Sequence, residues 1–400
     1  MNSEEIIDTP VNTENNEEER IFHTLEKVTD IESEDNRIRF NLEKGEVVLS
    51  FLTQDIVRVT MGKRSNVKLA TTPAIKDHNF SYDGFKTYQQ DNKFLIKTEK
   101  LTISVDTSDF SLAFYDKEDN LIQEDNSPAL GWSGDEVWAW KKSRTNERYY
   151  GLGEKTGFLD KTGREYSMWN TDVFESHVES TDPMYVSVPF FIGFNPNNSF
   201  GIFFDNSFKS HFDFRLKENK TYAFWAEGGT LDYYFINGPG LKDVVSKYSD
   251  LTGKMPLPPK WSLGYHQSRY SYKNEDRVRE IANNFRQRQI PCDTIHLDIH
   301  YMDDYRVFTW DEDRFFSPEK MISDLDDSGF KIVNIIDPGV KKDPEYKAYQ
   351  DGIKNDCFCK YMDGSLYSGD VWPGESVFPD FTQTKVRNWW KKMHRPLLEQ

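Results

Sequence analysis

The chain has 400 residues, of which 37% are hydrophobic and 15% aromatic, enough for two or three domains with substantial cores. Its formal net charge of −17 repels phosphate backbones and argues against nucleic acid as a partner. The sequence has no apolar run near the ~18 residues of a membrane span and no signal-peptide pattern at its start. We therefore expect no membrane partner and a cytoplasmic location.

Residues 1–20 are acidic and polar and are typical of a disordered tail. The segment that follows, residues 21–255, holds short runs in which apolar and polar residues alternate, which is the period of a half-buried strand. Polar turn residues separate the runs, and no long helical pattern occurs before about residue 240. This pattern predicts an antiparallel β-sandwich. The clearest expected strands are residues 47–52, 56–59, 101–105, 110–114, 201–204 and 222–225.

The Pro-rich segment 255–260 interrupts this pattern and indicates a linker. After it, expected strands at residues 261–265, 294–299 and 331–336 alternate with expected helices. Asn274 is expected to cap the first helix and Ser317-Pro318 to begin the second, with Gly329 as its stop. The last helix is expected to present Val386, Trp389, Trp390, Met393 and Leu397 on one face.

Repeated strand–helix units are typical of a parallel β/α fold, either a doubly wound sheet or a (β/α)8 TIM barrel. A complete barrel takes about 250 residues. Residues 256–400 are too few for that, so the sequence predicts at most a partial barrel after the sandwich.

Ligand sites in parallel β/α folds lie at the carboxyl ends of the strands. The second expected strand runs into Asp298, a carboxylate suited to accept hydrogen bonds from sugar hydroxyls, although a loop cap or salt bridge is the commoner role of one such residue. The third runs into Ile336-Asp337-Pro338-Gly339. Trp372 precedes Pro373-Gly374 on an expected loop, where a rigidly held indole offers a face for stacking.

Other reactive residue types indicate structural roles. Cys292, Cys357 and Cys359 lack the spacing and the histidines of a metal or redox site, so we expect inert thiols. The carboxylates after the second expected strand indicate a solvated loop or a weak cation site rather than a catalytic pair. They are Asp303, Asp304, Asp311 and Asp313.

Several short motifs, taken in order, resemble the N-terminal sandwich and the first half of the catalytic barrel of glycoside hydrolase family 31. The sandwich motifs, in a domain that resembles galactose mutarotase, are Tyr150-Gly151-Leu152-Gly153-Glu154 and Met168-Trp169-Asn170-Thr171-Asp172. The barrel motifs are Pro259-Lys260-Trp261-Ser262-Leu263-Gly264-Tyr265, Gln267-Ser268-Arg269-Tyr270, Ile290-Pro291-Cys292-Asp293, Asp298-Ile299-His300-Tyr301-Met302, Phe308-Thr309-Trp310-Asp311, Ile336-Asp337-Pro338-Gly339 and Val371-Trp372-Pro373-Gly374.

The resemblance implies an exo-acting, retaining α-glucosidase that releases terminal α-linked glucose from oligosaccharides and needs no cofactor. Family members use a nucleophile in a Trp-x-Asp-Met-Asn-Glu segment on the fourth barrel strand and an acid/base further along. Neither motif occurs in this sequence, which stops where the fourth strand is expected. The resemblance therefore places both catalytic residues beyond Gln400 and predicts that the chain alone is inactive.

By motif match, the resemblance assigns the pocket for the terminal sugar to Asp298, Ile336 and Trp372. Asp298 would accept hydrogen bonds, and the other two side chains would form apolar walls. The resemblance places Asp172, on a sandwich loop, against the next sugar. His300 stands where many members have Asp, and we expect it to support Asp298 rather than bind sugar directly. No metal site is implied.

Two alternative functions stay open. The first is an α-xylosidase or α-glucosyltransferase of the same family, because a xylose pocket differs by added bulk where the C6 hydroxymethyl group sits. The second is a non-catalytic fragment that retains weak carbohydrate binding. The reading frame after codon 400 distinguishes these classes, since a continuation that encodes the missing segment favours an enzyme and a stop codon favours a fragment.

Overall fold

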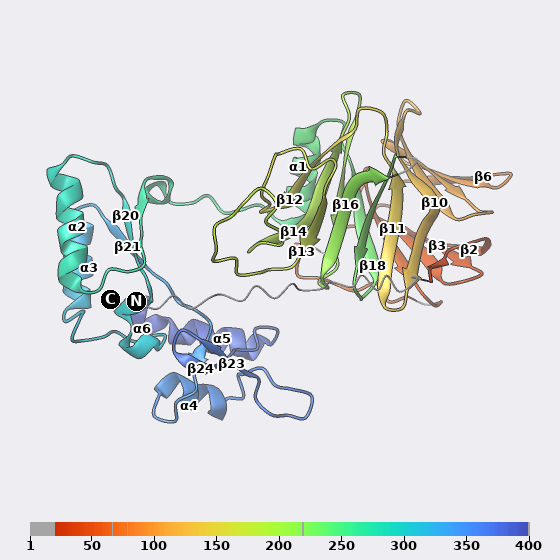
Figure 1. Ribbon diagram of the computed structural model, residues 1–400. Coiled ribbons are helices and arrows are strands. Elements are labelled where there is room, and N and C mark those ends of the chain that lie inside the picture. Colours follow the sequence, from red (N-terminus) through yellow and green to blue (C-terminus); the bar gives the residue numbers. More distant parts are fainter. Residues whose placement is uncertain (1–20, 66, 78, 218–219, 399–400) are drawn as a thin grey trace, which may run out of the picture. The chain divides into compact units, whose positions relative to one another are not determined.

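The computed structural model describes residues 21–65, 67–77, 79–217 and 220–398, so the tail expected at residues 1–20 lies outside the described part. The chain forms two compact units, which divide between Met255 and Pro256. In Figure 1 the strands of the first unit run from red to green, and the second unit is teal to blue. None of the helices in the described ranges is long and apolar enough to cross a membrane.

The first unit is an antiparallel β-sandwich, which confirms the prediction. One sheet has ten strands in the order β13-β16-β17-β11-β10-β9-β8-β7-β6, with β1 paired to β10. Its strands are β1 (His23–Thr24), β6 (Lys86–Gln90), β7 (Lys93–Lys97), β8 (Leu101–Asp106), β9 (Ser111–Asp116), β10 (Leu121–Ser133), β11 (Glu136–Lys142), β13 (Glu165–Met168), β16 (Ser210–Lys217) and β17 (Thr221–Ala226).

The second sheet of the sandwich has eight strands in the order β12-β14-β15-β18-β5-β4-β3-β2. The strands are β2 (Val28–Glu34), β3 (Arg37–Leu42), β4 (Glu46–Phe51), β5 (Ile56–Gly62), β12 (Arg148–Gly153), β14 (Ser187–Phe194), β15 (Ser199–Phe204) and β18 (Leu231–Asn237). All the strands expected in residues 47–225 are confirmed.

The sandwich core forms because alternate residues of each strand point to opposite faces of the sheet. In β9, Leu112 and Phe114 are buried while Ala113 between them is half-exposed. The ring of Phe114 stacks on that of Phe235 in β18, with ring centroids 3.9 Å apart, so the two sheets meet through aromatic contacts. Such stacked pairs add to the free energy that burial alone contributes.

Helix α1 (Leu241–Thr252) packs on the eight-stranded sheet and ends the first unit. Its Val244 and Leu251 are buried, and its Tyr248 stacks on Phe190 of β14 with ring centroids 3.8 Å apart. The helix begins just after residue 240, as the absence of earlier helical patterns predicts.

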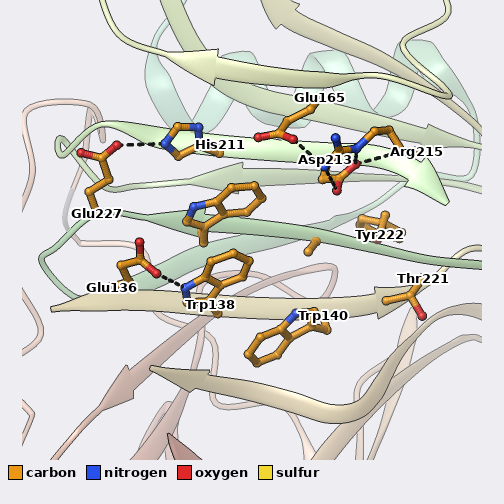
Figure 2. A pocket seen from close by; sticks show the side chains of 12 residues that line it. Glu136, Trp138, Trp140, Glu165, His211, Asp213, Arg215, Thr221, Tyr222 and Glu227 are labelled. Carbon is orange, nitrogen blue, oxygen red and sulfur yellow. Dashed lines mark hydrogen bonds and ion pairs between the residues drawn. The ribbon is translucent and has the colours of Figure 1, made fainter. Parts of the chain in front are cut away.

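The ten-stranded sheet carries a group of aromatic side chains on its outer face (Figure 2). Trp138 of β11 and Trp225 of β17 are cross-strand neighbours whose rings stack 4.2 Å apart, within 3° of parallel. Figure 2 shows charged side chains around these rings, among them Glu136, Glu227 and Arg215.

The second unit begins with a three-stranded parallel sheet, in the order β19-β20-β21. Helices α2 and α3 connect the strands, as the sequence predicts. The Asn274 side chain caps α2 by accepting a hydrogen bond from the Arg277 amide, and Pro318 occupies the first turn of α3. Gly329 follows α3 with φ at +78°, a conformation that favours glycine. The elements are β19 (His266–Gln267), α2 (Glu275–Gln287), β20 (Thr294–Leu297), α3 (Pro318–Asp327) and β21 (Lys331–Asn334).

The prediction of a strand at residues 261–265 is wrong. Residues Lys260–Leu263 form a 3-10 helix, and only His266–Gln267 pair with β20. The reason is local, because the amide and hydroxyl of Ser262 both donate to the Pro259 carbonyl, at 3.0 and 2.8 Å. These local hydrogen bonds replace the hydrogen bonds that the backbone would make to a neighbouring strand. An apolar sequence pattern gives no sign of them.

The remainder of the second unit contains a small antiparallel sheet, in the order β22-β24-β23, which the sequence did not indicate. The expected last helix is confirmed, but it breaks at His394, so that Leu397 belongs to a separate short helix. Within the described ranges the parallel sheet is open and no barrel closes, as expected for a partial TIM barrel. The elements are β22 (Val340–Lys341), α4 (Lys347–Lys354), β23 (Ser368–Val371), β24 (Gly374–Val377), α5 (Thr384–Met393) and α6 (Arg395–Leu398).

Candidate functional site

The carboxyl ends of β20 and β21 lie side by side and bring two loops together. Leu297 pairs with Asn334 at the last register position, and the Ile335 amide donates to the Leu297 carbonyl at 3.1 Å. The Tyr301 hydroxyl then donates to the Ile335 carbonyl at 2.8 Å. These bonds fix the segments that carry Asp298 and Ile336 at one edge of the sheet, where parallel β/α folds place their sites.

Asp298 is the first residue after β20. It is half-buried, and its carboxylate accepts a hydrogen bond from the Ile299 amide at 2.8 Å, so the residue caps the short 3-10 helix Ile299–Tyr301. The cap holds the carboxylate in one orientation. One amide bond leaves acceptor capacity on both oxygens, as a ligand for sugar hydroxyls requires.

Asp337 lies close enough to Asp298 for the two carboxylates to repel each other. Burial raises the pKa of Asp337, and the charge of Asp298 raises it further. A carboxyl group whose pKa is raised by burial and by a neighbouring carboxylate is a candidate for a functional site. The sequence motif Ile336-Asp337-Pro338-Gly339 contains this residue, and the rule that sites lie at strand ends could have identified it, but only Ile336 was assigned a role.

We expect Asp337→Asn to stabilise the second unit at pH 7. The raised pKa means that the folded state disfavours the ionised carboxylate, so stability is lost as pH rises through the folded-state pKa. Because Asp337 is partly exposed, the gain should stay below ~1 kcal/mol, or up to about 2–4 °C in melting temperature. The gain should shrink at pH 4, because a larger share of Asp337 is then protonated in the folded state.

Asp343→Asn is the matched control for this measurement. Hydrogen bonding from Arg306 lowers the pKa of Asp343, so this carboxylate is stabilising above its unfolded pKa and the substitution should lower the melting temperature at pH 7. Thermal unfolding of both variants at pH 7 and pH 4 gives the comparison. A lower melting temperature for Asp337→Asn at pH 7 would show that contacts stabilise its charge.

Aromatic side chains gather around the Asp298 loop. The ring centroid of Tyr270, which follows β19, lies 5.3 Å from that of His300 and 6.2 Å from that of Trp372. The ring centroid of Tyr305 lies 5.4 Å from that of His300. Tyr270 thus joins His300 and Trp372 into one aromatic group, a role that its motif did not reveal.

His300 is half-buried, and its ring nitrogens have unequal surroundings. Its Nε2 lies 3.5 Å from the Tyr305 hydroxyl, and its Nδ1 is buried without a hydrogen-bond partner among the described residues. Among the described residues, the Asp298 carboxylate accepts a hydrogen bond from the Ile299 amide and none from His300. Any support of Asp298 by His300 therefore acts through packing and not through a hydrogen bond.

Trp372 and Ile336 lie on two different loops of the second unit, and their assignment as pocket walls stays a prediction. Trp372 and Pro373 form the two-residue turn between β23 and β24, and the indole is 63% exposed. Ile336 is partly buried and packs against the core of the second unit. The hairpin explains how a large apolar ring is held in solvent, because Val371 and Gly374 pair directly on either side of it.

Asp172 lies in the first unit, on the loop between β13 and β14. It is exposed, and its carboxylate accepts a hydrogen bond from the Tyr185 hydroxyl at 2.9 Å. The neighbouring Thr171 amide donates to the Met184 carbonyl at 3.0 Å, so the loop is cross-linked to itself. Its assignment to the second sugar stays a prediction.

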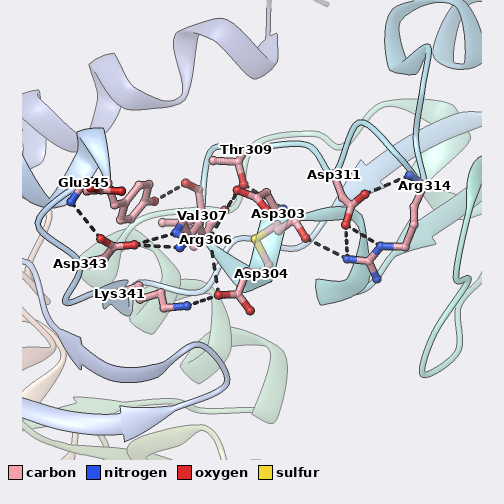
Figure 3. Close-up of polar contacts among 12 residues, drawn as sticks. Asp303, Asp304, Arg306, Val307, Thr309, Asp311, Arg314, Lys341, Asp343 and Glu345 are labelled. Atoms are coloured by element: carbon pink, nitrogen blue, oxygen red, sulfur yellow. Dashed lines mark hydrogen bonds and ion pairs between the residues drawn. The ribbon is translucent and has the colours of Figure 1, made fainter.

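The acidic stretch after β20 forms ion pairs, as Figure 3 shows. Arg306 contacts Asp303, Asp304 and Asp343, with its closest contact to Asp343 at 2.8 Å. Lys341 also pairs with Asp304. Farther along, Arg314 contacts Asp311 at 2.6 Å, and hydrogen bonding from Arg314 lowers the pKa of that carboxylate. These contacts neutralise the stretch and favour the loop interpretation over catalysis.

No group of three or more His, Cys, Asp or Glu side chains in the described ranges could hold a metal ion. Cys292 and Cys357 are buried, Cys359 is half-buried, and all are free thiols. Burial raises the pKa of each thiol, which disfavours the reactive thiolate.

Family models match most of the chain. The model described as the glycosyl hydrolases family 31 TIM-barrel domain matches residues 255–400, and the one described as the glycosyl hydrolase 31 N-terminal galactose mutarotase-like domain matches residues 46–213. The sandwich and the partial barrel correspond to the two domain types that these models describe. The chain belongs to glycoside hydrolase family 31.

Named relatives agree with this membership. The chain is 45% identical over 357 residues to alpha-glucosidase 2 of Bacillus thermoamyloliquefaciens. The alignment covers 89% of this chain and 45% of that protein. It is 37% identical over 257 residues to the alpha-glucosidase of Saccharolobus solfataricus. That alignment covers 64% of this chain and 37% of that protein.

A solved structure also resembles the chain along most of its length. A mutant of the family 31 dextranase of Flavobacterium johnsoniae, complexed with isomaltotriose, superposes with a TM-score of 0.85 at 31% identity. The match covers 94% of this chain and 46% of that one. The chain thus spans less than half the length of each of these relatives.

Proposed function

We propose that the protein is a retaining, exo-acting α-glucosidase that releases terminal α-linked glucose from oligosaccharides. In this proposal Asp298 accepts hydrogen bonds from hydroxyls of the terminal sugar, while Trp372 and Ile336 form the apolar walls of its pocket. His300, whose Nδ1 has no partner among the described residues, borders the same pocket. Asp172 is proposed to contact the next sugar.

One observation carries the proposal. Adjacent strand ends bring Asp298 beside Asp337, and the loop that Asp298 begins carries His300, which joins Tyr270 and Trp372 in one aromatic group. Carboxylates bind sugar hydroxyls, and ring faces cover the apolar C–H surfaces of a pyranose. The names of the similar proteins support the choice of α-glucosides, since two are alpha-glucosidases and one is a dextranase complexed with isomaltotriose.

Bond cleavage needs two further carboxylates, a nucleophile and an acid/base, about 5–5.5 Å apart. The sequence contains no Trp-x-Asp-Met-Asn-Glu segment. We propose that both residues belong to a part of the whole protein outside this chain. That part would correspond to the segment of the relatives that this chain does not span. The residues described here then bind and orient the terminal sugar.

The test compares two polypeptides on p-nitrophenyl α-glucoside and p-nitrophenyl α-xyloside. The 400-residue chain should release no p-nitrophenol above background. The product of the whole reading frame that contains it should turn over the glucoside at roughly 1–1000 per second. Preference for the xyloside would support the alternative within the family, and turnover by the 400-residue chain would contradict the location proposed for the catalytic carboxylates.

A further inference from the structure

A cavity of about 390 Å³ opens on the outer face of the ten-stranded sheet, within the first unit. Its lining comes from the neighbouring strands β11, β17, β16 and β13 and from Glu227 just after β17 (Figure 2). The volume is in the range of small-ligand sites. The cavity lies in a different unit from Asp298 and is not used by the mechanism proposed above.

Strand register explains why the cavity exists. Ala223 of β17 pairs with Trp140 of β11 on one side and with Asp213 of β16 on the other. Neighbouring strands lie ~4.8 Å apart, so the backbones of Trp140 and Asp213 are separated by about 10 Å. The short side chain of Ala223 between them leaves a notch. The next cross-strand row, Trp138, Trp225 and His211, has large rings at every position and closes one side of the notch.

The aromatic wall is rigid because its rings pack on one another. Trp138 and Trp140 lie 5.6 Å apart at 15°, and His211 stacks on Trp225 at 4.8 Å and 15°. Trp138 and Trp225 are more than nine-tenths buried, whereas Trp140, beside the notch, is half-exposed. Phe22 packs edge-on against Trp138 and Trp140, with ring centroids 5.3 and 5.2 Å away, so the wall presents the exposed part of Trp140 and the ring edges of its neighbours to a ligand.

The polar side of the notch is also held in place before any ligand binds. Arg215 donates to both oxygens of Asp213, at 2.8 and 2.7 Å, and contacts Glu165 at 2.6 Å. Two carboxylates thus orient a guanidinium that is about half-exposed. Groups fixed in this way lose little conformational entropy on binding, which favours affinity.

The charge of the lining selects the class of ligand. Among the described residues that line the cavity there are four carboxylates, and Arg215 is the one permanently cationic side chain. An anionic ligand is therefore repelled. An aromatic wall opposite a fixed array of carboxylates and one guanidinium suits a neutral polyhydroxylated ring. The carboxylates belong to Glu136, Glu165, Asp213 and Glu227.

We propose that this notch is a second, non-catalytic carbohydrate site that binds a glucose unit of a neutral α-glucan. The choice of glucan rests on the proposed function, whereas the existence of the site rests on the cavity and its lining. Binding here holds a polymeric substrate on the sandwich.

The test is native gel electrophoresis of the 400-residue chain in gels that contain increasing amounts of dextran or amylopectin. The chain should be retarded by at least one of these polymers. Ala223→Leu fills the notch and should weaken the apparent affinity about tenfold or more. Ala113→Leu is the matched control, because Ala113 is also half-exposed, lies on β9 of the same sheet and is outside the cavity. It should leave retardation unchanged.

Arg215→Gln gives a second variant that removes an exposed donor without adding bulk, and it should also weaken retardation. Retardation that is unchanged by both Ala223→Leu and Arg215→Gln, or absent with both polymers, would overturn the proposal. Hydrolysis plays no part in this readout. A longer product that keeps Ala223-dependent retardation but releases no glucose would contradict the proposed function alone.

Discussion

Lys141→Met is expected to destabilise the sandwich by about 3–5 kcal/mol. Lys141 and Asp125 are fully buried and paired, and Lys141 Nζ also donates to the Tyr233 hydroxyl at 2.7 Å. Burial raises the pKa of Asp125 and lowers that of Lys141, so each charge depends on the other. Removing the lysine leaves a carboxylate buried without its counterion.

Asp125→Asn in the Lys141→Met background should restore much of the lost stability. Asparagine removes the uncompensated charge and keeps an acceptor for the Leu112 amide, which donates to Asp125 at 2.9 Å. Because the pKa of Asp125 is raised by burial, the deficit of the single variant should grow as pH rises through that pKa and shrink in acid.

Lys142→Met is the matched control, since Lys142 is the next residue and pairs with Glu124 at 3.3 Å where both side chains are exposed. It should cost less than about 1 kcal/mol. Urea unfolding of the variants gives the free energies. A cost for Lys141→Met as small as that of Lys142→Met would show that water reaches the pair.

Asp298→Ala is expected to lower kcat/KM about 100-fold or more if the product of the reading frame that contains this chain is the proposed α-glucosidase. Two charge-assisted hydrogen bonds to sugar hydroxyls are each worth roughly 1.5–3 kcal/mol. Such contacts often strengthen in the oxocarbenium-like transition state, so kcat should fall as well as KM rise. Steady-state kinetics on one short α-glucoside measures both.

Asp304→Ala and His300→Ala serve as comparisons. Asp304 lies nearby but pairs with Lys341 and Arg306, and its loss should leave kcat/KM nearly unchanged. His300 should matter less than Asp298, because its Nε2 faces Tyr305 and not the carboxylate. If His300→Ala proved the more damaging change in a folded protein, His300 and not Asp298 would be the principal sugar ligand.

Much of the sandwich could be predicted because strand alternation is a local signal. Phe110, Leu112 and Phe114 recur at every second position, and all are buried. Helix α2 could be predicted equally well, since asparagine is a common helix-capping residue and Asn274 does cap this helix. In these segments local propensity, hydrophobic period and tertiary packing agree.

The failures have non-local or side-chain causes. An apolar pattern at residues 261–265 did not reveal that Ser262 bonds back to Pro259. The Trp372 hairpin depends on β24 pairing with β22 as well as β23, a contact across more than thirty residues of chain. Asp337 and Tyr270 became candidate site residues only through the register of β20 with its neighbours, which brings their loops to one edge.

Proton NMR of the sugar released from p-nitrophenyl α-glucoside tests the central claim most directly. The assay uses the product of the reading frame that contains this chain. A retaining α-glucosidase must first release α-glucose, which then mutarotates towards the equilibrium mixture. We expect the α-anomer signal to appear before the β-anomer signal. Release of β-glucose first, or of no glucose by a folded protein, would contradict the proposed function.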